Sequence, residues 1–314
     1  MENESRQRIQ AVMDQVNKVI IGKEEEVKKV FLAILAGGHI LLEDIPGVGK
    51  TTMALAFSKA MNLSFKRVQF TPDVVPSDIT GFSMYDQGST SFVYTPGAVM
   101  CHFFLADEIN RTSSKTQSAL LEVMEEGYVT VDQKRYEMKN PFIVLATQNP
   151  VGTAGTQTLP EAQLDRFMVQ LSMGYPDFQA QVDLLRDRGK TNPLDDVESI
   201  AEDGDIRQWK KEVQEVFVDD KILAYITHLT EATRTDINIK LGVSPRGALA
   251  LMAMGRSRAM VDGRDYVIPT DIEESFLDVC SHRIIADPKV QLSRMTARDL
   301  LEKILRETEK PVVE

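Results

Sequence analysis

The chain has 314 residues, of which 43% are hydrophobic and 26% charged, so it can bury a core and is expected to form about two domains. Its 36 lysines and arginines against 47 aspartates and glutamates give a net charge of −11, which disfavours proteins that hold nucleic acid through its phosphates or bind anionic membranes. The chain has only two cysteines, Cys101 and Cys280, and its 4 histidines show no metal-ligand spacing. It has no signal-peptide pattern and no apolar run near the ~18 residues of a membrane span. These features predict a cytoplasmic protein.

Between residues 20 and 173 the pattern alternates between strand-like and helix-like segments. Strands are expected at residues 39–43, 65–70, 100–106, 142–147 and 167–173, and helices at 50–62 and 115–126. The third and fourth of these strands are apolar at consecutive positions, which is typical of strands covered on both faces. Two further segments, residues 81–97 and 128–138, read as hairpins, with surface decoration as the alternative to a functional role. The fold class predicted is α/β with a parallel sheet.

After residue 176 the pattern becomes helical. Apolar residues recur at helical spacing in 219–234, and Ser244 followed by Pro245 predicts the start of a helix that runs to about residue 261. Thr270 and Glu273 fit a capping box ahead of another apolar stretch, whereas residues 192–204 look like a loop. The chain is therefore expected to divide into an α/β domain at residues 1–175 and an α-helical domain at residues 176–314.

Residues 44–51 read Asp-Ile-Pro-Gly-Val-Gly-Lys-Thr between a predicted strand and a predicted helix. This context favours a phosphate-binding loop over a chance glycine-rich turn, although the strict pattern has glycine where this chain has Asp44. Glycines let the backbone approach a triphosphate, while Lys50 reaches the β- and γ-phosphates and the Thr51 hydroxyl ligates Mg²⁺. The residues expected to bind the nucleotide are Gly47, Val48, Gly49, Lys50, Thr51 and Thr52.

Polar side chains follow the next two buried strands of the pattern. Asp107 and Glu108 end one strand, where the first could hold Mg²⁺ through water and the second could polarise an attacking water. Asn149 ends the following strand and could position that water or sense the γ-phosphate. An ordinary Asn-Pro turn remains the alternative for Asn149.

Two arginines complete the predicted constellation. Arg166 precedes the last strand at the edge of the α/β domain, where it could reach the γ-phosphate of a neighbouring subunit; the alternatives are an ion pair with Asp165 or a surface charge. Arg246 follows the cap at Ser244 and could contact the nucleotide of its own chain; the alternative is a surface arginine. A cation is unfavourable in the first turn of a helix, so an anionic partner is expected for Arg246.

This order of features resembles an AAA+ ATPase: a phosphate loop, an Asp-Glu strand, an Asn-tipped strand, an arginine before the last strand, and Ser-Pro-Arg in a helical lid. More narrowly, five segments are similar to the MoxR family: residues 42–51 (Leu-Glu-Asp-Ile-Pro-Gly-Val-Gly-Lys-Thr), 106–111 (Ala-Asp-Glu-Ile-Asn-Arg), 115–121 (Lys-Thr-Gln-Ser-Ala-Leu-Leu), 146–150 (Ala-Thr-Gln-Asn-Pro) and 159–167 (Leu-Pro-Glu-Ala-Gln-Leu-Asp-Arg-Phe). The family tolerates an aspartate at position 44.

The resemblance implies a three-layer core with a five-stranded parallel sheet, a helical lid, and assembly into a ring, commonly a hexamer, that binds ATP and Mg²⁺. It assigns the roles of Walker A lysine and Mg²⁺ ligand, Walker B pair, sensor 1, arginine finger and sensor 2. In that order the residues are Lys50, Thr51, Asp107, Glu108, Asn149, Arg166 and Arg246.

The two hairpins correspond, on this resemblance, to the helix-2 insert and the pre-sensor-1 insert, which face a pore or a partner. MoxR-like proteins act as chaperone-like ATPases that mature protein complexes or insert metal cofactors, often with a partner carrying a von Willebrand factor A domain. The resemblance thus implies a protein client, while the net charge of −11 and the lack of a basic stretch interleaved with aromatic residues disfavour a nucleic-acid partner. Two other functions remain open at this point: a nucleic-acid-dependent AAA+ motor, and an ATP-binding scaffold with negligible turnover.

Overall fold

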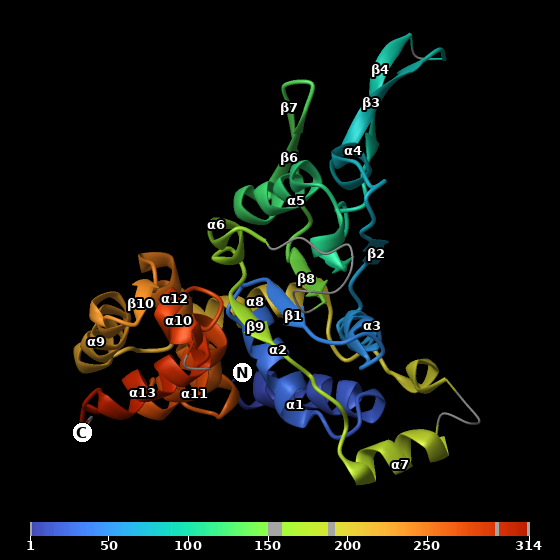
Figure 1. The fold of residues 1–314 in the computed structure, drawn as a ribbon. Coiled ribbons are helices and arrows are strands. Elements are labelled where there is room, and N and C mark those ends of the chain that lie inside the picture. Colours follow the sequence, from blue (N-terminus) through green and yellow to red (C-terminus); the bar gives the residue numbers. More distant parts are fainter. Residues whose placement is uncertain (1, 89, 150–158, 188–191, 293–294, 313–314) are drawn as a thin grey trace.

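A parallel sheet of five strands forms the centre of the molecule (Figure 1). The computed structural model describes residues 2–88, 90–149, 159–187, 192–292 and 295–312, so Pro150 of the predicted motif lies outside the described residues. The sheet has the order β2-β5-β8-β1-β9. Its strands are β1 (Ile40–Glu43), β2 (Phe65–Gln69), β5 (Phe103–Asp107), β8 (Ile143–Gln148) and β9 (Val169–Leu171). All four neighbouring pairs are parallel, which confirms the predicted fold class.

Helices cover both faces of this sheet. On one face lie α1 (Glu2–Val19), α2 (Glu24–Leu35) and α3 (Lys50–Ala60), and on the other lie α4 (Pro76–Thr80) and α5 (Ser114–Glu126) (Figure 1). Because side chains alternate along a strand, Phe103 and Leu105 join the core under α1–α3, whereas Phe104 and Ala106 join the core under α5. The consecutive apolar residues of β5 and β8 therefore fill two separate cores. Helices α1 and α2 lie outside the elements predicted above.

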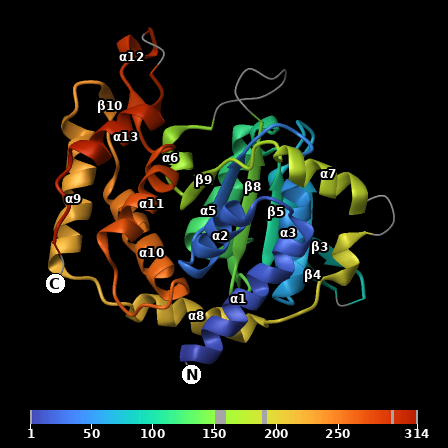
Figure 2. The ribbon, with the colours of Figure 1, turned by 90° about the horizontal axis from the view of Figure 1, so that it is seen from below.

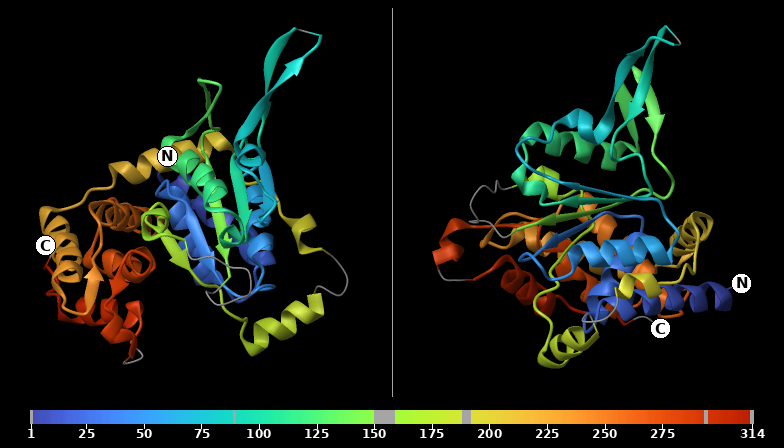
Figure 3. Two further views of the ribbon diagram at one scale, coloured as in Figure 1. Left: turned by 45° about the horizontal axis from the view of Figure 1, so that its top comes forward. Right: turned by 90° about the vertical axis from the view of Figure 1, so that its right-hand side faces the viewer.

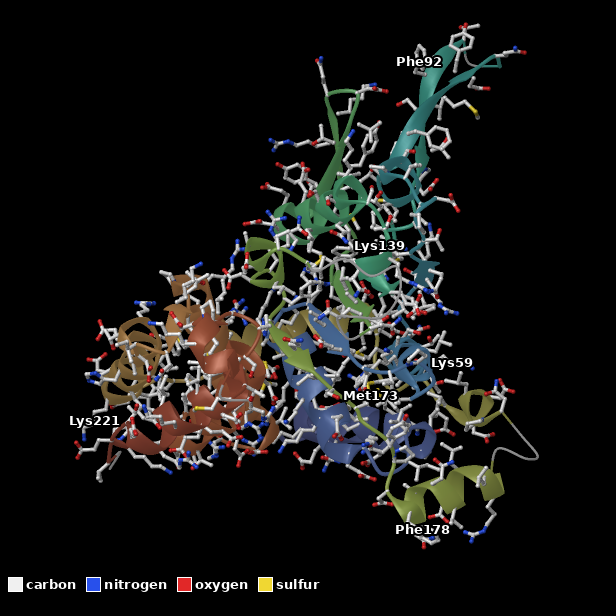
Figure 4. All side chains as sticks on the ribbon, in the orientation of Figure 1. Lys59, Phe92, Lys139, Met173, Phe178 and Lys221 are labelled. Carbon is white, nitrogen blue, oxygen red and sulfur yellow. The ribbon has the colours of Figure 1, made fainter. Side chains whose placement is uncertain are left out.

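Two antiparallel hairpins extend from the α5 side of the core (Figures 1 and 3). They are formed by β3 (Gly81–Asp86) with β4 (Ser91–Pro96) and by β6 (Tyr128–Val131) with β7 (Lys134–Glu137). This confirms the prediction of two hairpins. The rings of Tyr94 and Tyr136 stack at 3.9 Å between centroids and connect the two hairpins. Phe92, which is 70% exposed, lies far out on the longer hairpin (Figure 4).

The rest of the described chain is mainly helical, as predicted. Its longer helices are α7 (Phe178–Asp187), α8 (Asp203–Glu215), α9 (Asp220–Thr235), α10 (Pro245–Val261), α11 (Pro269–Cys280) and α13 (Ala297–Glu307). The shorter elements are α6 (Glu161–Leu164), α12 (Pro288–Leu292), the 3-10 helices η1 (Ile109–Arg111) and η2 (Pro193–Asp196), and the strands β10 (Ile239–Leu241) and β11 (Ile285–Ala286). Residues 192–204, expected to be a loop, also contain η2 and the first two residues of α8. No helix in the described ranges has both the length and the apolar composition needed to cross a membrane.

The two predicted helix starts differ in outcome. Ser244 caps α10 as expected, since its hydroxyl accepts the N–H of Gly247 at 3.2 Å. The capping box predicted at Thr270 is wrong, because the N-cap of α11 is Ile268 and the helix begins at Pro269, so Thr270 already lies in the first turn. The carboxylate of Asp271, the third residue of the helix, accepts the N–H of Ile268 at 2.9 Å. It thereby pairs an N–H at the helix start that has no partner within the helix.

Helices α9, α10, α11 and α13 form a unit beside strand β9, on the left in Figure 1, and α8 runs toward this unit behind the sheet as seen in Figure 1 (Figures 1 and 2). The end of α11 anchors it to the core through Arg283, whose side chain is almost fully buried. Arg283 donates to the carbonyls of Phe167 and Met168 at 2.6 and 3.0 Å, immediately before β9. Burial of this cation among carbonyl acceptors fixes where the helical unit meets the sheet.

Candidate nucleotide-binding site

The predicted phosphate loop connects β1 to α3 at the carboxyl edge of the sheet. Gly47 and Gly49 have φ values of 88° and 98°, in the left-handed region that glycine adopts at least cost. A Cβ on Gly47 would meet nothing within 4 Å, so this glycine is required by its backbone conformation and not by lack of space within the chain. A cavity of about 350 Å³ opens over this loop. The residues that line it are Pro46, Gly47, Gly49, Lys50, Thr51, Thr52, Arg67, Gln69, Asp107, Glu108 and Asn149.

Lys50 is buried at the base of this cavity. Its Nζ donates to the main-chain carbonyl of Asp44 at 2.7 Å. Burial lowers the pKa of Lys50, while the nearby carboxylates of Asp44, Asp107 and Glu108 act to raise it. The lysine therefore stands among acidic groups and has one carbonyl contact that an incoming phosphate oxygen could replace.

The Asp107 carboxylate ends β5 and has three donors around it. Thr147 Oγ1 on the neighbouring strand β8 donates to Asp107 Oδ1 at 2.6 Å. Arg67 on β2 donates to Oδ2 from two nitrogens, at 2.6 and 3.2 Å. Sequence reasoning missed both Arg67 and Thr147. The signal for Arg67 was a basic residue three positions before the end of the predicted strand at residues 65–70. In a parallel sheet the carboxyl end of that strand meets the carboxyl end of β5.

Glu108 follows in the left-handed region, with φ of 56°, which is uncommon for a residue other than glycine. Its N–H donates to Thr147 Oγ1 at 2.8 Å, which holds this conformation. Its carboxylate accepts from Arg111 at 2.6 Å and from Asn149 Nδ2 at 3.0 Å. Strained backbone is frequent at functional sites, where surrounding contacts maintain it. The turn directs the Glu108 side chain toward Asn149 and the phosphate-loop cavity.

Asn149 lies at the tip of β8, beside the preceding acidic strand as predicted. Its Oδ1 is buried and has no hydrogen-bond partner among the described residues. An unpaired buried acceptor calls for a donor, and an ordered water would supply one. The oxygen donor set for Mg²⁺ is also present, because the Thr51 hydroxyl and the Asp107 carboxylate line the same cavity. The residues therefore fit a magnesium-bound triphosphate.

A second cavity of about 240 Å³ adjoins the phosphate loop. It is lined by Val19, Ile20, Ile21, Lys23, Pro46, Gly47, Val48, Gly49, Tyr175, Pro176, Gln181 and Leu184. Its walls are mostly apolar and come from the α1–α2 turn, the phosphate loop and the segment entering α7. Such walls suit a planar base. Sequence reasoning missed this cavity, because Ile20 and Tyr175 are far from any motif and come together only in the fold.

Arg246 is placed differently from the prediction. It lies with Arg166 at the opposite, amino-terminal edge of the sheet, where both line a cavity of about 380 Å³. Both guanidinium groups pair with the carboxylate of Glu125 near the end of α5, Arg166 at 2.9 Å. The prediction that Arg246 contacts the nucleotide of its own chain is not met in this structure. The anionic partner expected for Arg246 is present, and it is Glu125.

The docking of the helical unit explains this placement. Ser244, two residues before Arg246, donates its hydroxyl to the Asp165 carboxylate at 3.0 Å. Arg283 at the end of α11 donates to the same carboxylate at 2.9 Å. Asp165 immediately precedes Arg166, and its carboxylate also holds Ser244, which lies two residues before Arg246. These contacts keep Arg166 and Arg246 side by side. Arg166 pairs with Glu125, and Asp165 pairs with Arg283. These two ion pairs take the place of the Arg166–Asp165 pair that was the alternative.

A strand–phosphate loop–helix unit, an acidic pair on the adjacent buried strand and a helical lid together define a phosphate-loop ATPase of the AAA class. Residues 39–169 match the ATPase family associated with various cellular activities (AAA), and residues 231–304 match the AAA lid domain. The chain is 37% identical to the chaperone MoxR1 of Mycobacterium tuberculosis over 308 residues, which cover 95% of this chain and 81% of that protein. It belongs to the MoxR family of AAA ATPases.

Two further comparisons extend over nearly the whole chain. The uncharacterized protein YeaC of Bacillus subtilis is 45% identical over 300 residues, covering 96% of this chain and 94% of that protein. The crystal structure of a proposed ATPase from Cytophaga hutchinsonii superposes with a TM-score of 0.92 at 37% identity, covering 99% of this chain and 97% of that one. The likeness to a solved structure therefore includes the lid as well as the nucleotide-binding core.

Proposed function

We propose that this AAA ATPase assembles into a ring, commonly a hexamer in its family, in which each nucleotide lies between two neighbouring chains. The observation that carries this proposal is the pairing of Arg166 and Arg246 on Glu125, at the edge of the sheet remote from their own phosphate loop. Two arginines that share a carboxylate are arranged to share an anion. The γ-phosphate of a neighbouring chain would replace Glu125 and complete that neighbour's site.

Within one chain, the phosphate loop would hold the β- and γ-phosphates with Lys50 and with the backbone N–H groups of residues 47–52, Val48 and Thr52 included. Thr51 and, through water, Asp107 would hold Mg²⁺, whose charge offsets that of the phosphates. Glu108 would accept a proton from the attacking water, and Asn149 would orient the water through its unpaired Oδ1. The apolar cavity at Ile20 and Tyr175 would hold the base.

For the division of the chain, we propose a nucleotide-binding core at residues 1–175 and a helical lid at 176–314. The coupled positions of Arg246, Ser244 and Arg283 would make lid orientation depend on the neighbour's nucleotide. Two free, buried cysteines suit the reducing environment of the cytoplasm.

The client is proposed to be a protein, remodelled during complex maturation or metal cofactor insertion, with a von Willebrand factor A protein as the working partner. The relative named chaperone MoxR1 supports a chaperone role. A net charge of −11 favours a protein client over a nucleic-acid-dependent motor. The β3–β4 hairpin, with Phe92, Tyr85 and Met84 exposed, offers an apolar surface away from the nucleotide site for a client or partner.

Subunit mixing tests the shared site. Glu108→Gln chains lack the base but keep Arg166, and Arg166→Ala chains lack the arginine but keep the base. An equal mixture should recover about a quarter of wild-type ATPase activity, because about a quarter of random interfaces then combine an intact base with an intact arginine. As a control, Glu108→Gln mixed with Lys50→Ala should recover none, since no site becomes complete. Activity no higher than that of either variant alone in the first mixture would refute the shared site.

A further inference from the structure

The Asp44 side chain, at the position where the strict phosphate-loop pattern has glycine, is buried and used fully as an acceptor. Its Oδ2 accepts the N–H of Met173, the N–H of Gly174 at 2.9 Å, and the hydroxyl of Ser172 at 3.2 Å. Its Oδ1 accepts the N–H of Ile45 at 3.2 Å. Hydrogen bonds to a buried carboxylate are among the strong ones in proteins. Asp44 thus connects the phosphate loop to the three residues after β9.

The main chain of the same residue contacts the phosphate-binding lysine. The Asp44 carbonyl accepts from Lys50 Nζ at 2.7 Å, so one residue holds Lys50 with its backbone and residues 172–174 with its side chain. A phosphate oxygen that drew Lys50 Nζ toward it would weaken this carbonyl contact. A change at Lys50 therefore acts directly on the residue that holds the end of β9.

The segment held by Asp44 leads into a wall of the base cavity. Tyr175 and Pro176 line that cavity together with Ile20 and Ile21. The Tyr175 carbonyl accepts from Lys23 Nζ at 3.0 Å, which ties the segment to the α1–α2 turn as well. In Figure 4 Met173 lies at the end of β9, near the middle of the molecule, and the chain then runs outward to Phe178 on α7. Residues 172–176 therefore connect the phosphate loop, the base cavity and α7.

We propose that Asp44 is a positioning residue that couples phosphate binding at Lys50 to the base-cavity wall formed by residues 172–176. The coupling rests on the proposed function in that ATP is taken to occupy this site. It makes an unusual prediction: Asp44→Gly restores the strict phosphate-loop pattern and yet impairs the protein, because the carboxylate that holds Met173 and Gly174 is lost.

Hydrogen–deuterium exchange without nucleotide tests the contact itself. In Asp44→Gly, amide exchange in a peptide spanning residues 171–176 should become about tenfold faster or more, since the buried N–H of Met173 and the half-buried N–H of Gly174 lose a carboxylate acceptor. Asp44→Asn keeps the shape and one acceptor oxygen and should fall between Asp44→Gly and the wild type. Asp73→Gly, at an exposed aspartate, serves as the matched control and should leave this peptide unchanged. Unchanged exchange in Asp44→Gly would overturn the proposal.

A second arm adds saturating Mg-ATP to chains that also carry Glu108→Gln, so that nucleotide is not consumed. With Asp44 present, ATP should slow exchange both in the phosphate loop, residues 45–52, and at residues 171–176. With Asp44→Gly the loop should still be protected while the protection at 171–176 is lost. Equal protection of residues 171–176 in both chains would overturn the coupling. If ATP protected neither segment of the chain that keeps Asp44, the proposed nucleotide site would be overturned. The exchange measured without nucleotide would then still show whether Asp44 holds residues 172–174.

Steady-state kinetics of Asp44→Asn separate this role from a purely structural one. The KM for ATP should rise about tenfold with kcat within about twofold of wild type, because Lys50, Asp107 and Glu108 keep their places. A loss of kcat at unchanged KM would contradict a positioning role in nucleotide binding. Unfolding in urea, compared between Asp44→Asn and wild type, verifies that the measured chains are folded.

Discussion

Thr147 is predicted to hold the two carboxylates of the site in place, and Thr147→Val tests this with almost no change in shape. The Thr147 hydroxyl is fully buried, donates to Asp107 at 2.6 Å and accepts the N–H of Glu108 at 2.8 Å. Valine would leave a buried N–H unpaired and remove one donor from a carboxylate, each at a cost of about 1–3 kcal/mol. Because Arg67 still pairs with Asp107, we expect the free energy of unfolding to fall by about 2–4 kcal/mol in total.

The same substitution should lower kcat about tenfold or more, since the left-handed turn at Glu108 depends on that N–H contact. The assays are urea unfolding followed by circular dichroism and steady-state ATP hydrolysis. Thr147→Ser keeps the hydroxyl and should remain near wild type in kcat. Thr230→Val, at a buried lid threonine whose hydroxyl bonds only within its own helix among the described contacts, should leave kcat unchanged. A Thr147→Val protein with wild-type stability and kcat would refute the reasoning.

Two further predictions concern Arg67 in the nucleotide-binding cavity and His39, which is buried just before β1 at the opposite edge of the sheet. Arg67→Gln should lower the Mg²⁺ concentration for half-maximal ATPase activity about threefold to fivefold. The reason is that Arg67, which is half-exposed, pairs with Asp107, and such a pair contributes about 1 kcal/mol. An unchanged or higher Mg²⁺ concentration for half-maximal activity would contradict this. Burial lowers the pKa of His39 to about 4, so below pH 6.5 the unfolded chain binds a proton that the folded chain refuses, and this contribution to stability is lost as pH falls from about 6.5 toward 4. Between pH 7.5 and 5.0 it should amount to about 2 kcal/mol in urea unfolding, and His39→Gln should remove that part of the pH dependence; an equal pH dependence in the variant would refute it.

The local features of the site could be predicted because the chemistry of parallel strand ends is local in sequence. Lys50, Asp107, Glu108 and Asn149 each follow a buried strand, and parallel strands of one sheet end at one edge. The structure accordingly brings these four side chains to one cavity, while their roles in hydrolysis stay predictions. Arg67 has the same geometry, and its strand was predicted, but a charged residue inside an edge strand is also an ordinary surface residue.

Features that depend on packing between distant segments could not be predicted. The position of Arg246 is set by Arg283, which lies 37 residues later and is buried against carbonyls before β9. The position of Arg246 in the first turn of a helix predicted an anionic partner, and that partner is Glu125. In the same way, Asp44 looked like a tolerated departure from a motif, and only the fold shows the N–H groups of Met173 and Gly174 around its carboxylate.

The most direct test of hydrolysis at this site is ATP turnover by the wild-type protein and by a Glu108→Gln variant under the same conditions. We expect hydrolysis by the wild type and a loss of about a hundredfold or more in the variant, with nucleotide still bound, because the carboxylate that accepts the proton is gone while Lys50 and the phosphate loop remain. Equal turnover in the two proteins, or bound ATP that neither protein hydrolyses, would contradict it and would favour an ATP-binding scaffold.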